Sequence, residues 1–202
     1  MAARIRLADE GDAAAIAAIY RPVVEETAIS FETIAPDQRE IARRVADTLR
    51  TYPWLVCDRD GHIAGYAYAS KHRVRAAYQW SVDTSVYVDS RDRRSGVGRA
   101  LYLSLFAILA EQGYFNAFAG IALPNPGSVA LHEAMGFEKL GVYRNVGYKL
   151  GEWRDVGWWQ LSLKEMEAAP SDPIELATVR QKPGWQELLA CGESAIHAHR
   201  AA

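Results

Sequence analysis

The sequence predicts an α/β domain in which helices flank a mixed, mainly antiparallel sheet. Short runs rich in Val, Ile, Tyr and Trp alternate with longer segments whose apolar residues have helical spacing. Residues 54–70 contain a tight Asp-Gly turn between two apolar runs and therefore predict an antiparallel hairpin. The strand-like run at 82–88 leads through a glycine turn into a helix. The expected order along the chain is β-α-α-β-β-β-α-β-α-β-β.

The first half of the chain begins with a short strand around Ile5. Asp9 and Asp12 precede an alanine-rich run and predict a helix start. Asp37 caps a second helix whose apolar face carries Ile41 and Val45. The hairpin at 54–70 follows, and then a strand is expected over residues 78–88.

The second half opens with a helix that carries Leu101, Leu105, Ile108 and Leu109 on one stripe and ends at Gly113. Residues 115–123 predict a buried strand. Asn125 and Pro126 begin a further helix, and residues 139–163 form a strand, a turn and a strand. Prolines punctuate the chain after residue 167, so residues 1–167 form the predicted domain. Residues 168–202 are a C-terminal extension, in which 185–202 could form an amphipathic helix.

Composition excludes several classes of protein. The 202 residues are 50% hydrophobic and 24% charged, which is typical of a globular domain. A net charge of −2 argues against a nucleic-acid binder. No apolar run is long enough to cross a bilayer, and the two cysteines lack the spacing of metal ligands. We therefore expect a soluble cytoplasmic protein with no membrane partner, no metal and unpaired thiols.

The turn from Arg93 to Gly98 has the pattern R-x-x-G-x-G between a strand and a helix. The first amides of a helix have no intrahelical partner and lie at the positive end of its dipole, so such a turn can bind an anion such as phosphate. The dinucleotide fingerprint fails because Leu101 stands where its third glycine would be, and the nucleotide P-loop pattern is absent. A turn with solvated arginines is the alternative interpretation.

This turn resembles the acetyl-CoA pyrophosphate loop of the GCN5-related N-acetyltransferases. Five separated segments resemble one branch of that superfamily, the phosphinothricin (methionine sulfoximine) acetyltransferases: YPWLVCDRDGHIAGYAYAS, AYQWSVDTSVYV, RRSGVGRALY, LPNPGSVALHEAMGF and GYKLGEWRDVGWWQL. The resemblance covers about residues 4–165. It implies the acyl-CoA N-acyltransferase fold, acetyl-CoA as co-substrate, direct attack of the acceptor amine in a ternary complex, and a homodimer.

The resemblance also implies two catalytic residues. Asp83 stands where the branch usually has glutamate as general base; it is one methylene shorter, and a salt-bridged strand carboxylate is the alternative. His132 stands where this branch carries histidine and many relatives carry tyrosine as the acid that protonates the thiolate. A packed or surface histidine is the alternative.

The remaining site residues follow from the same resemblance. The backbone of Val86 and Val88 would contact the thioester and pantetheine, with Tyr87 between them, and Asn125 and Ser128 would add side-chain contacts unless Asn125 serves only as a helix cap. The pyrophosphate would bind the loop residues Arg93, Arg94, Ser95, Gly96, Val97, Gly98 and Arg99. We expect Gly96→Asp to abolish acetyl-CoA binding because its carboxylate would face the pyrophosphate.

For the acceptor, Arg73 and Arg75 are candidate clamps for a carboxylate or phosphinate, because guanidinium binds such oxyanions bidentately. Phe31 and Tyr78 could wall the pocket. The predicted function is N-acetylation of the α-amine of a small amino-acid-like acceptor, such as phosphinothricin, methionine sulfoximine or methionine sulfone. A protein or peptide N-acetyltransferase and a catalytically silent acetyl-CoA-binding module are the alternatives.

Overall fold

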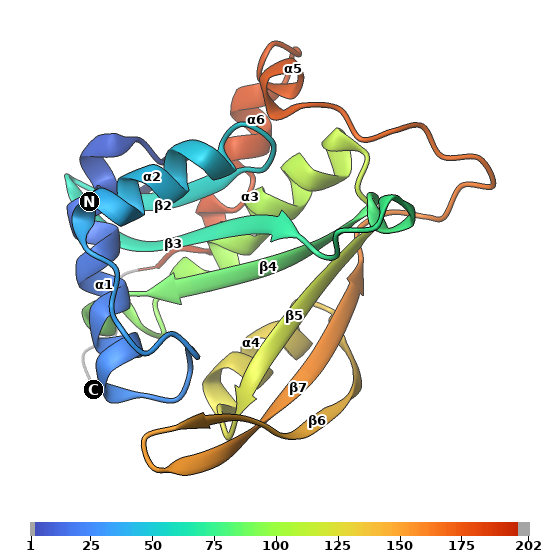
Figure 1. The fold of residues 1–202 in the computed structure, drawn as a ribbon. Coiled ribbons are helices and arrows are strands. Elements are labelled where there is room, and N and C mark those ends of the chain that lie inside the picture. The colour runs from blue at the N-terminus through green and yellow to red at the C-terminus, as the bar shows by residue number, and fades with distance from the viewer. Residues whose placement is uncertain (1–2, 198–202) are drawn as a thin grey trace.

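The computed structural model describes residues 3–197 and shows a mixed sheet with helices on both faces (Figure 1). Its seven strands are β1 (Ala3–Leu7), β2 (Trp54–Arg59), β3 (His62–Lys71), β4 (Ser81–Val88), β5 (Asn116–Leu123), β6 (Glu138–Lys149) and β7 (Glu152–Ser162). Their order in the sheet is β1-β2-β3-β4-β5-β7-β6. Among the strands of the described residues, only β4 and β5 are parallel neighbours. The predicted fold class and chain order are confirmed.

Helices α1 (Ala13–Glu26) and α2 (Gln38–Thr48) cover one face of the sheet, and α3 (Val97–Gln112) covers the other. Helix α4 (Pro126–Ala134) packs against β5 on the α3 side. Two short helices, α5 (Leu176–Arg180) and α6 (Trp185–Ala190), lie against α3. No helix within residues 3–197 is both long enough and apolar enough to span a membrane.

The two faces of the sheet have separate apolar cores because successive strand residues point to opposite sides. In β2, Trp54 and Val56 pack with α1 and α2, whereas Leu55 and Cys57 pack with α3. This two-sided burial explains why β2 is apolar at consecutive positions rather than at alternate ones.

The helix ends form as predicted. Asp9 and Asp12 make a reciprocal capping box, and the Asp37 carboxylate accepts from the Glu40 amide at 2.8 Å. The Asn125 side chain accepts from the Ser128 amide at 3.1 Å, and Gly113 ends α3 with φ +96°. These signals each depend on a few neighbouring residues.

Two boundaries differ from the prediction. Tyr78 belongs to a 3₁₀ turn, Ala76–Tyr78, and the strand begins only at Ser81, because pairing with β3 reaches no further than Lys71 and Val82. The predicted helix at 185–202 ends at Ala190. Gly192 passes so close to the backbone of α3 that an added Cβ would overlap the Ala100 carbonyl oxygen, and a continuing helix cannot follow that path. Residues 198–202 of that prediction lie outside the described residues.

Candidate active site

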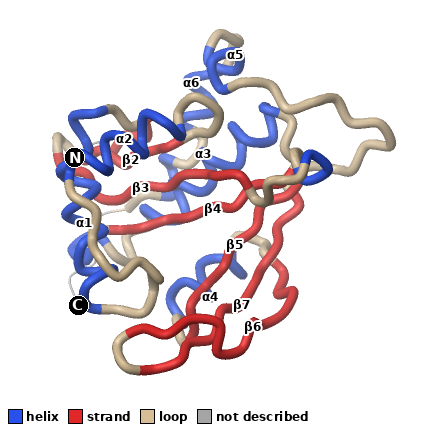
Figure 2. Tube along the Cα trace, viewed as in Figure 1, coloured by secondary structure: helices blue, strands red, loops and turns tan. Residues whose placement is uncertain are grey.

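The centre of the sheet contains a split between β4 and β5. The two strands pair only at their first residues, and the last pair joins Asp83 to Phe118. Beyond it they diverge, and Figure 2 shows β4 continuing towards α1 while β5 turns towards β7 and β6. The edge of β4 from Ser85 to Val88 that faces β5 therefore has no strand partner. Such an edge can bind an extended ligand through its backbone.

The loop before α3 lies at the open end of this split. Within residues 3–197, no protein acceptor bonds the amides from Arg93 to Arg99, and the first helical bond runs from the Ala100 amide to the Gly96 carbonyl at 2.9 Å. Left-handed conformations at Arg94 (φ +60°) and Gly96 (φ +82°) curve the loop, and the Ser95 hydroxyl fixes it by donating to Asp92 O at 2.6 Å. A run of free amides at a helix N-terminus is an anion site.

The arginines of the loop reinforce this site. Arg93, Arg94 and Arg99 have no carboxylate within salt-bridge distance among the described residues. Arg91 differs, because its guanidinium lies 2.8 Å from Asp89 and lowers the pKa of that carboxyl to about 2. The loop thus combines unpaired positive charge with free backbone donors.

The other side of the loop is covered by the C-terminal extension. The His197 amide donates to Ser95 O at 3.0 Å, and His197 Nε2 lies 3.2 Å from Arg94 O. A Cβ on Gly96 would overlap the Ala195 carbonyl oxygen. A side chain at residue 96 would therefore point at the extension, so the reason given above for the effect of Gly96→Asp, a carboxylate against the pyrophosphate, is wrong.

Asp83 lies at the inner end of the split, where it pairs with a histidine. Its carboxylate Oδ1 is 2.6 Å from Nδ1 of His72, the residue that follows β3. Burial raises the pKa of Asp83, and the hydrogen bond to His72 opposes that shift. About a third of the Asp83 side chain stays exposed (32%), so the carboxylate is open to the split.

A cavity of about 220 Å³ adjoins this pair. It is lined by His72, Arg73, Phe118, Leu140, Gly141, Tyr143 and Trp158. The Arg73 guanidinium lies 5.5 Å from the centroid of the Trp158 ring, a cation–π distance. The cavity therefore places one guanidinium and several aromatic rings beside Asp83.

The structure separates the four predicted acceptor residues. Arg73 lines the cavity, and the Tyr78 ring contacts the His72 ring edge-on with centroids 5.9 Å apart. Arg75 is exposed and does not line the cavity. Phe31 belongs to the loop between α1 and α2, and its ring lies against Gly147 of β6.

The loop between α1 and α2 also contacts the β6–β7 hairpin. The Lys149 ammonium donates to Ser30 O at 2.6 Å, and the Phe31 ring fills the space where Gly147 lacks a side chain. Burial lowers the pKa of Lys149. These contacts join the α1–α2 loop to the β6–β7 hairpin, and we call them the bridge.

His132 lies on the opposite side of the sheet from the cavity, in the core between α3 and α4. Its side chain is buried, and burial lowers its pKa. Nδ1 donates to Ser128 O at 2.7 Å, so Nε2 accepts from the Tyr102 hydroxyl at 2.9 Å. Both ring nitrogens therefore have protein partners.

His72 and His197 are not among the site residues predicted from the sequence. Antiparallel pairing of β3 with β4 brings His72 beside Asp83, so the register could have indicated that contact. No local signal connects His197 with the loop at Ser95.

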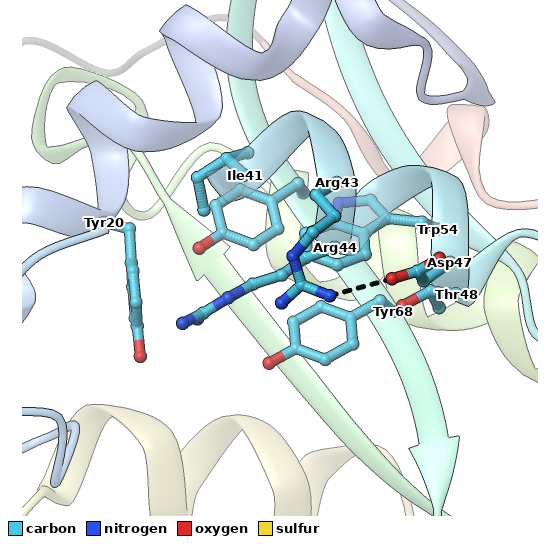
Figure 3. A pocket seen from close by; sticks show the side chains of 9 residues that line it. Tyr20, Ile41, Arg43, Arg44, Asp47, Thr48, Trp54 and Tyr68 are labelled. Atoms are coloured by element: carbon cyan, nitrogen blue, oxygen red, sulfur yellow. Dashed lines mark hydrogen bonds and ion pairs between the residues drawn. The ribbon is translucent and has the colours of Figure 1, made fainter. Parts of the chain in front are cut away.

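A second cavity, of about 230 Å³, lies under α2 and away from the split (Figure 3). The stacked rings of Trp54 and Tyr68, 4.3 Å apart, form its floor. Its most central cation, Arg44, is held by Glu32 at 2.7 Å and by Glu40 at 2.8 Å. This cavity has no free charged group to bind a ligand.

Comparison with known proteins agrees with this geometry. The family model described as "Acetyltransferase (GNAT) domain" matches residues 5–158. A phosphinothricin N-acetyltransferase of Streptomyces viridochromogenes is 40% identical over 175 residues, 86% of this chain and 94% of the relative. An L-methionine sulfoximine/L-methionine sulfone acetyltransferase of Salmonella typhimurium is 36% identical and covers 82% of this chain and 97% of its own length. The crystal structure of a phosphinothricin acetyltransferase from Sinorhizobium meliloti with acetyl-CoA superposes with a TM-score of 0.79 at 36% identity, covering 87% and 95%.

A split central strand pair beside an anion-binding helix start suits the binding of an acyl-CoA, and the family model and the relatives identify the class as an acetyl-CoA-dependent transferase. The chain belongs to the GNAT acetyltransferase family, and it is an acetyl-CoA-dependent N-acetyltransferase.

Proposed function

We propose that this enzyme acetylates the α-amine of a small amino-acid-like acceptor of the phosphinothricin, methionine sulfoximine or methionine sulfone type. The observation that carries the proposal is the cavity beside Asp83, with Arg73 in its wall. At about 220 Å³ it is smaller than the roughly 300–1,000 Å³ of common ligand pockets, so it suits a compact acceptor. A guanidinium is the side chain best shaped to hold a carboxylate or phosphinate.

In this proposal acetyl-CoA occupies the split. The free amides from Arg93 to Arg99 bind the pyrophosphate, and the unpaired backbone at Val86, Tyr87 and Val88 binds the pantetheine arm and the thioester. The Asn125 carbonyl oxygen already caps α4, so only its amide NH₂ remains to donate to the pantetheine beside Ser128.

The proposed reaction is direct attack in a ternary complex. The amine nitrogen attacks the thioester carbonyl carbon, the N–C bond forms, the C–S bond breaks and coenzyme A leaves as a thiolate. The amine proton passes to the acid–base pair of Asp83 and His72 at the inner end of the split. Holding both substrates together supplies the rest of the catalysis.

For His132 the geometry supports a positioning role. The hydrogen bond between its Nε2 and the Tyr102 hydroxyl ties α4 to α3, and its bond to Ser128 O lies within α4 and fixes the ring orientation. Protonation of the thiolate by His132 stays a prediction, and it would have to pass through Tyr102.

We also propose a cytoplasmic homodimer. The β6–β7 hairpin exposes six large apolar side chains, each at least half exposed: Leu140, Tyr143, Val146, Tyr148, Leu150 and Trp153. A cluster of that size is typical of a surface that another chain covers. Light scattering after gel filtration tests this, and a monomer at micromolar concentration would contradict it.

A thiol-release assay over a panel of amino acids, their analogues and short peptides tests the function. Turnover is expected with small acceptors that carry an anionic or sulfoximine group. Preference for peptides would favour the peptide N-acetyltransferase, against which the small volume of the cavity beside Asp83 argues. Acetyl-CoA binding without any turnover would favour the silent module.

A further inference from the structure

The pair of His72 and Asp83 places a second acid–base group, the His72 imidazole, beside the acceptor. His72 lines the acceptor cavity, whereas Asp83 does not. Only 10% of the His72 side chain is exposed, so its ring forms part of the cavity wall. The inference below rests on the proposed function, because it concerns the proton that the acceptor amine must lose.

Neighbouring rings hold the His72 ring in place. It stacks on Phe118 with centroids 4.2 Å apart and an angle of 14° between planes. Tyr78 and Trp158 meet it edge-on at 5.9 and 6.5 Å. A ring packed on three sides keeps one orientation, which an acid–base group needs.

The contact with Asp83 also determines which ring nitrogen is free. A carboxylate only accepts hydrogen bonds, so Nδ1 at 2.6 Å carries the proton. In a neutral imidazole, Nε2 on the opposite edge then has a free lone pair. A carboxylate that orients a histidine in this way leaves the outer nitrogen as the base.

We propose that His72 Nε2 takes the proton from the acceptor amine and that Asp83 positions and polarises the His72 ring. As the amine nitrogen bonds to the carbonyl carbon, its N–H proton moves to Nε2 and the thiolate takes the electrons of the C–S bond. The imidazolium is stabilised by the Asp83 carboxylate and then releases its proton to water. The carboxylate of Asp83 is one methylene shorter than that of a glutamate, and in this pair the His72 ring extends the acid–base group into the cavity.

The lining of the cavity supports this assignment. Arg73 follows His72 in the chain, and its Nη1 donates to His72 O at 2.9 Å. In an α-amino acid the amine nitrogen is two bonds from the carboxylate carbon, so a carboxylate held by Arg73 would place the amine in the cavity that His72 also lines. Arg73 and His72 thus line the same cavity as an anion clamp and a base.

The test compares His72→Phe, which keeps a ring stacked on Phe118, with His62→Phe, the same change at a histidine outside the cavity. His72→Phe is expected to lower kcat by about 100-fold or more, the usual contribution of a general base. Its acetyl-CoA affinity by calorimetry should stay within about twofold, and the rise of kcat/KM with pH should disappear. Imidazole added to His72→Ala should restore part of the rate.

Asp83→Asn separates the two residues. If both act as one unit, the double variant His72→Phe/Asp83→Asn is no slower than His72→Phe alone. A His72→Phe enzyme within about threefold of wild type, together with an Asp83→Asn enzyme slower by 100-fold, would overturn the proposal and make Asp83 the base.

A spectroscopic measurement keeps this test independent of the acceptor. Nitrogen-15 NMR of the free protein should show His72 with a proton on Nδ1 and none on Nε2, and Asp83→Asn should change that pattern. If wild type acetylates no amino-acid acceptor, the proposed function fails. The NMR measurement still tests whether Asp83 orients His72 in that case. A proton on Nε2 rather than on Nδ1 would refute the proposed role of Asp83.

Discussion

Replacing Gly96 by alanine tests whether the C-terminal extension stabilises the loop from Arg93 to Arg99, the proposed pyrophosphate site. Gly96 has φ +82°, and an added Cβ would overlap the Ala195 carbonyl oxygen. A left-handed backbone costs an L-residue about 1–2 kcal/mol. The extension would also have to move, which breaks the bond from the His197 amide to Ser95 O and the bond from Arg59 to His197 O.

Each of those bonds contributes about 0.5–1.5 kcal/mol. The expected loss in the free energy of unfolding is therefore about 2–5 kcal/mol, from the backbone strain and the two hydrogen bonds together. Acetyl-CoA affinity should fall as well, because Gly96 lies within the run of free amides.

Gly61→Ala is the matched control. Gly61 has φ +87°, but a Cβ there meets nothing within 4 Å. It should cost only the strain of about 1–2 kcal/mol. Urea unfolding of both variants, with calorimetric titration of acetyl-CoA, measures the difference. If Gly96→Ala cost no more than Gly61→Ala, the extension would not contact the loop in solution.

Three further predictions concern the acceptor cavity, the bridge and His132. Arg73→Lys should raise the KM for the acceptor about tenfold, because lysine cannot bind an oxyanion bidentately. The KM for acetyl-CoA should stay unchanged. Steady-state kinetics measures both values, with the same substitution at the exposed Arg21 as the control. Gly147→Ala should displace the Phe31 ring and destabilise the fold by about 1–3 kcal/mol, and hydrogen exchange should then be faster in residues 27–37 and unchanged in α3. Burial lowers the pKa of His132 below its ordinary 6.5, so its contribution to stability is complete above pH 6.5 and is lost as the pH falls towards the lower folded value. Urea unfolding at about pH 7.5 and pH 5.5 measures this loss. Between those values the free energy of unfolding of the wild type should fall by up to about 1.4 kcal/mol more per pH unit than that of His132→Gln. Equal losses in the two proteins would show that burial does not lower the pKa of His132.

The sequence by itself determined the local features of this protein. Asp37, Asn125 and Gly113 end their helices as predicted, because a cap depends on residues within one turn. The anion-binding turn before α3 could also be predicted, since free amides follow from the start of any helix. The motifs around these features sufficed to indicate the family.

Only the tertiary structure decided which distant residues meet. His72 reaches Asp83 because β3 and β4 pair in one particular register, and the extension reaches Ser95 from a point about a hundred residues further along the chain. Arg73 lies in the cavity wall and Arg75 outside it, although both belong to the connection that follows β3. Contacts of this kind depend on strand register and on backbones that approach closely, as at Gly96 and Gly192. No short stretch of sequence encodes them, because their free energy comes from surfaces that form only when the whole domain has packed.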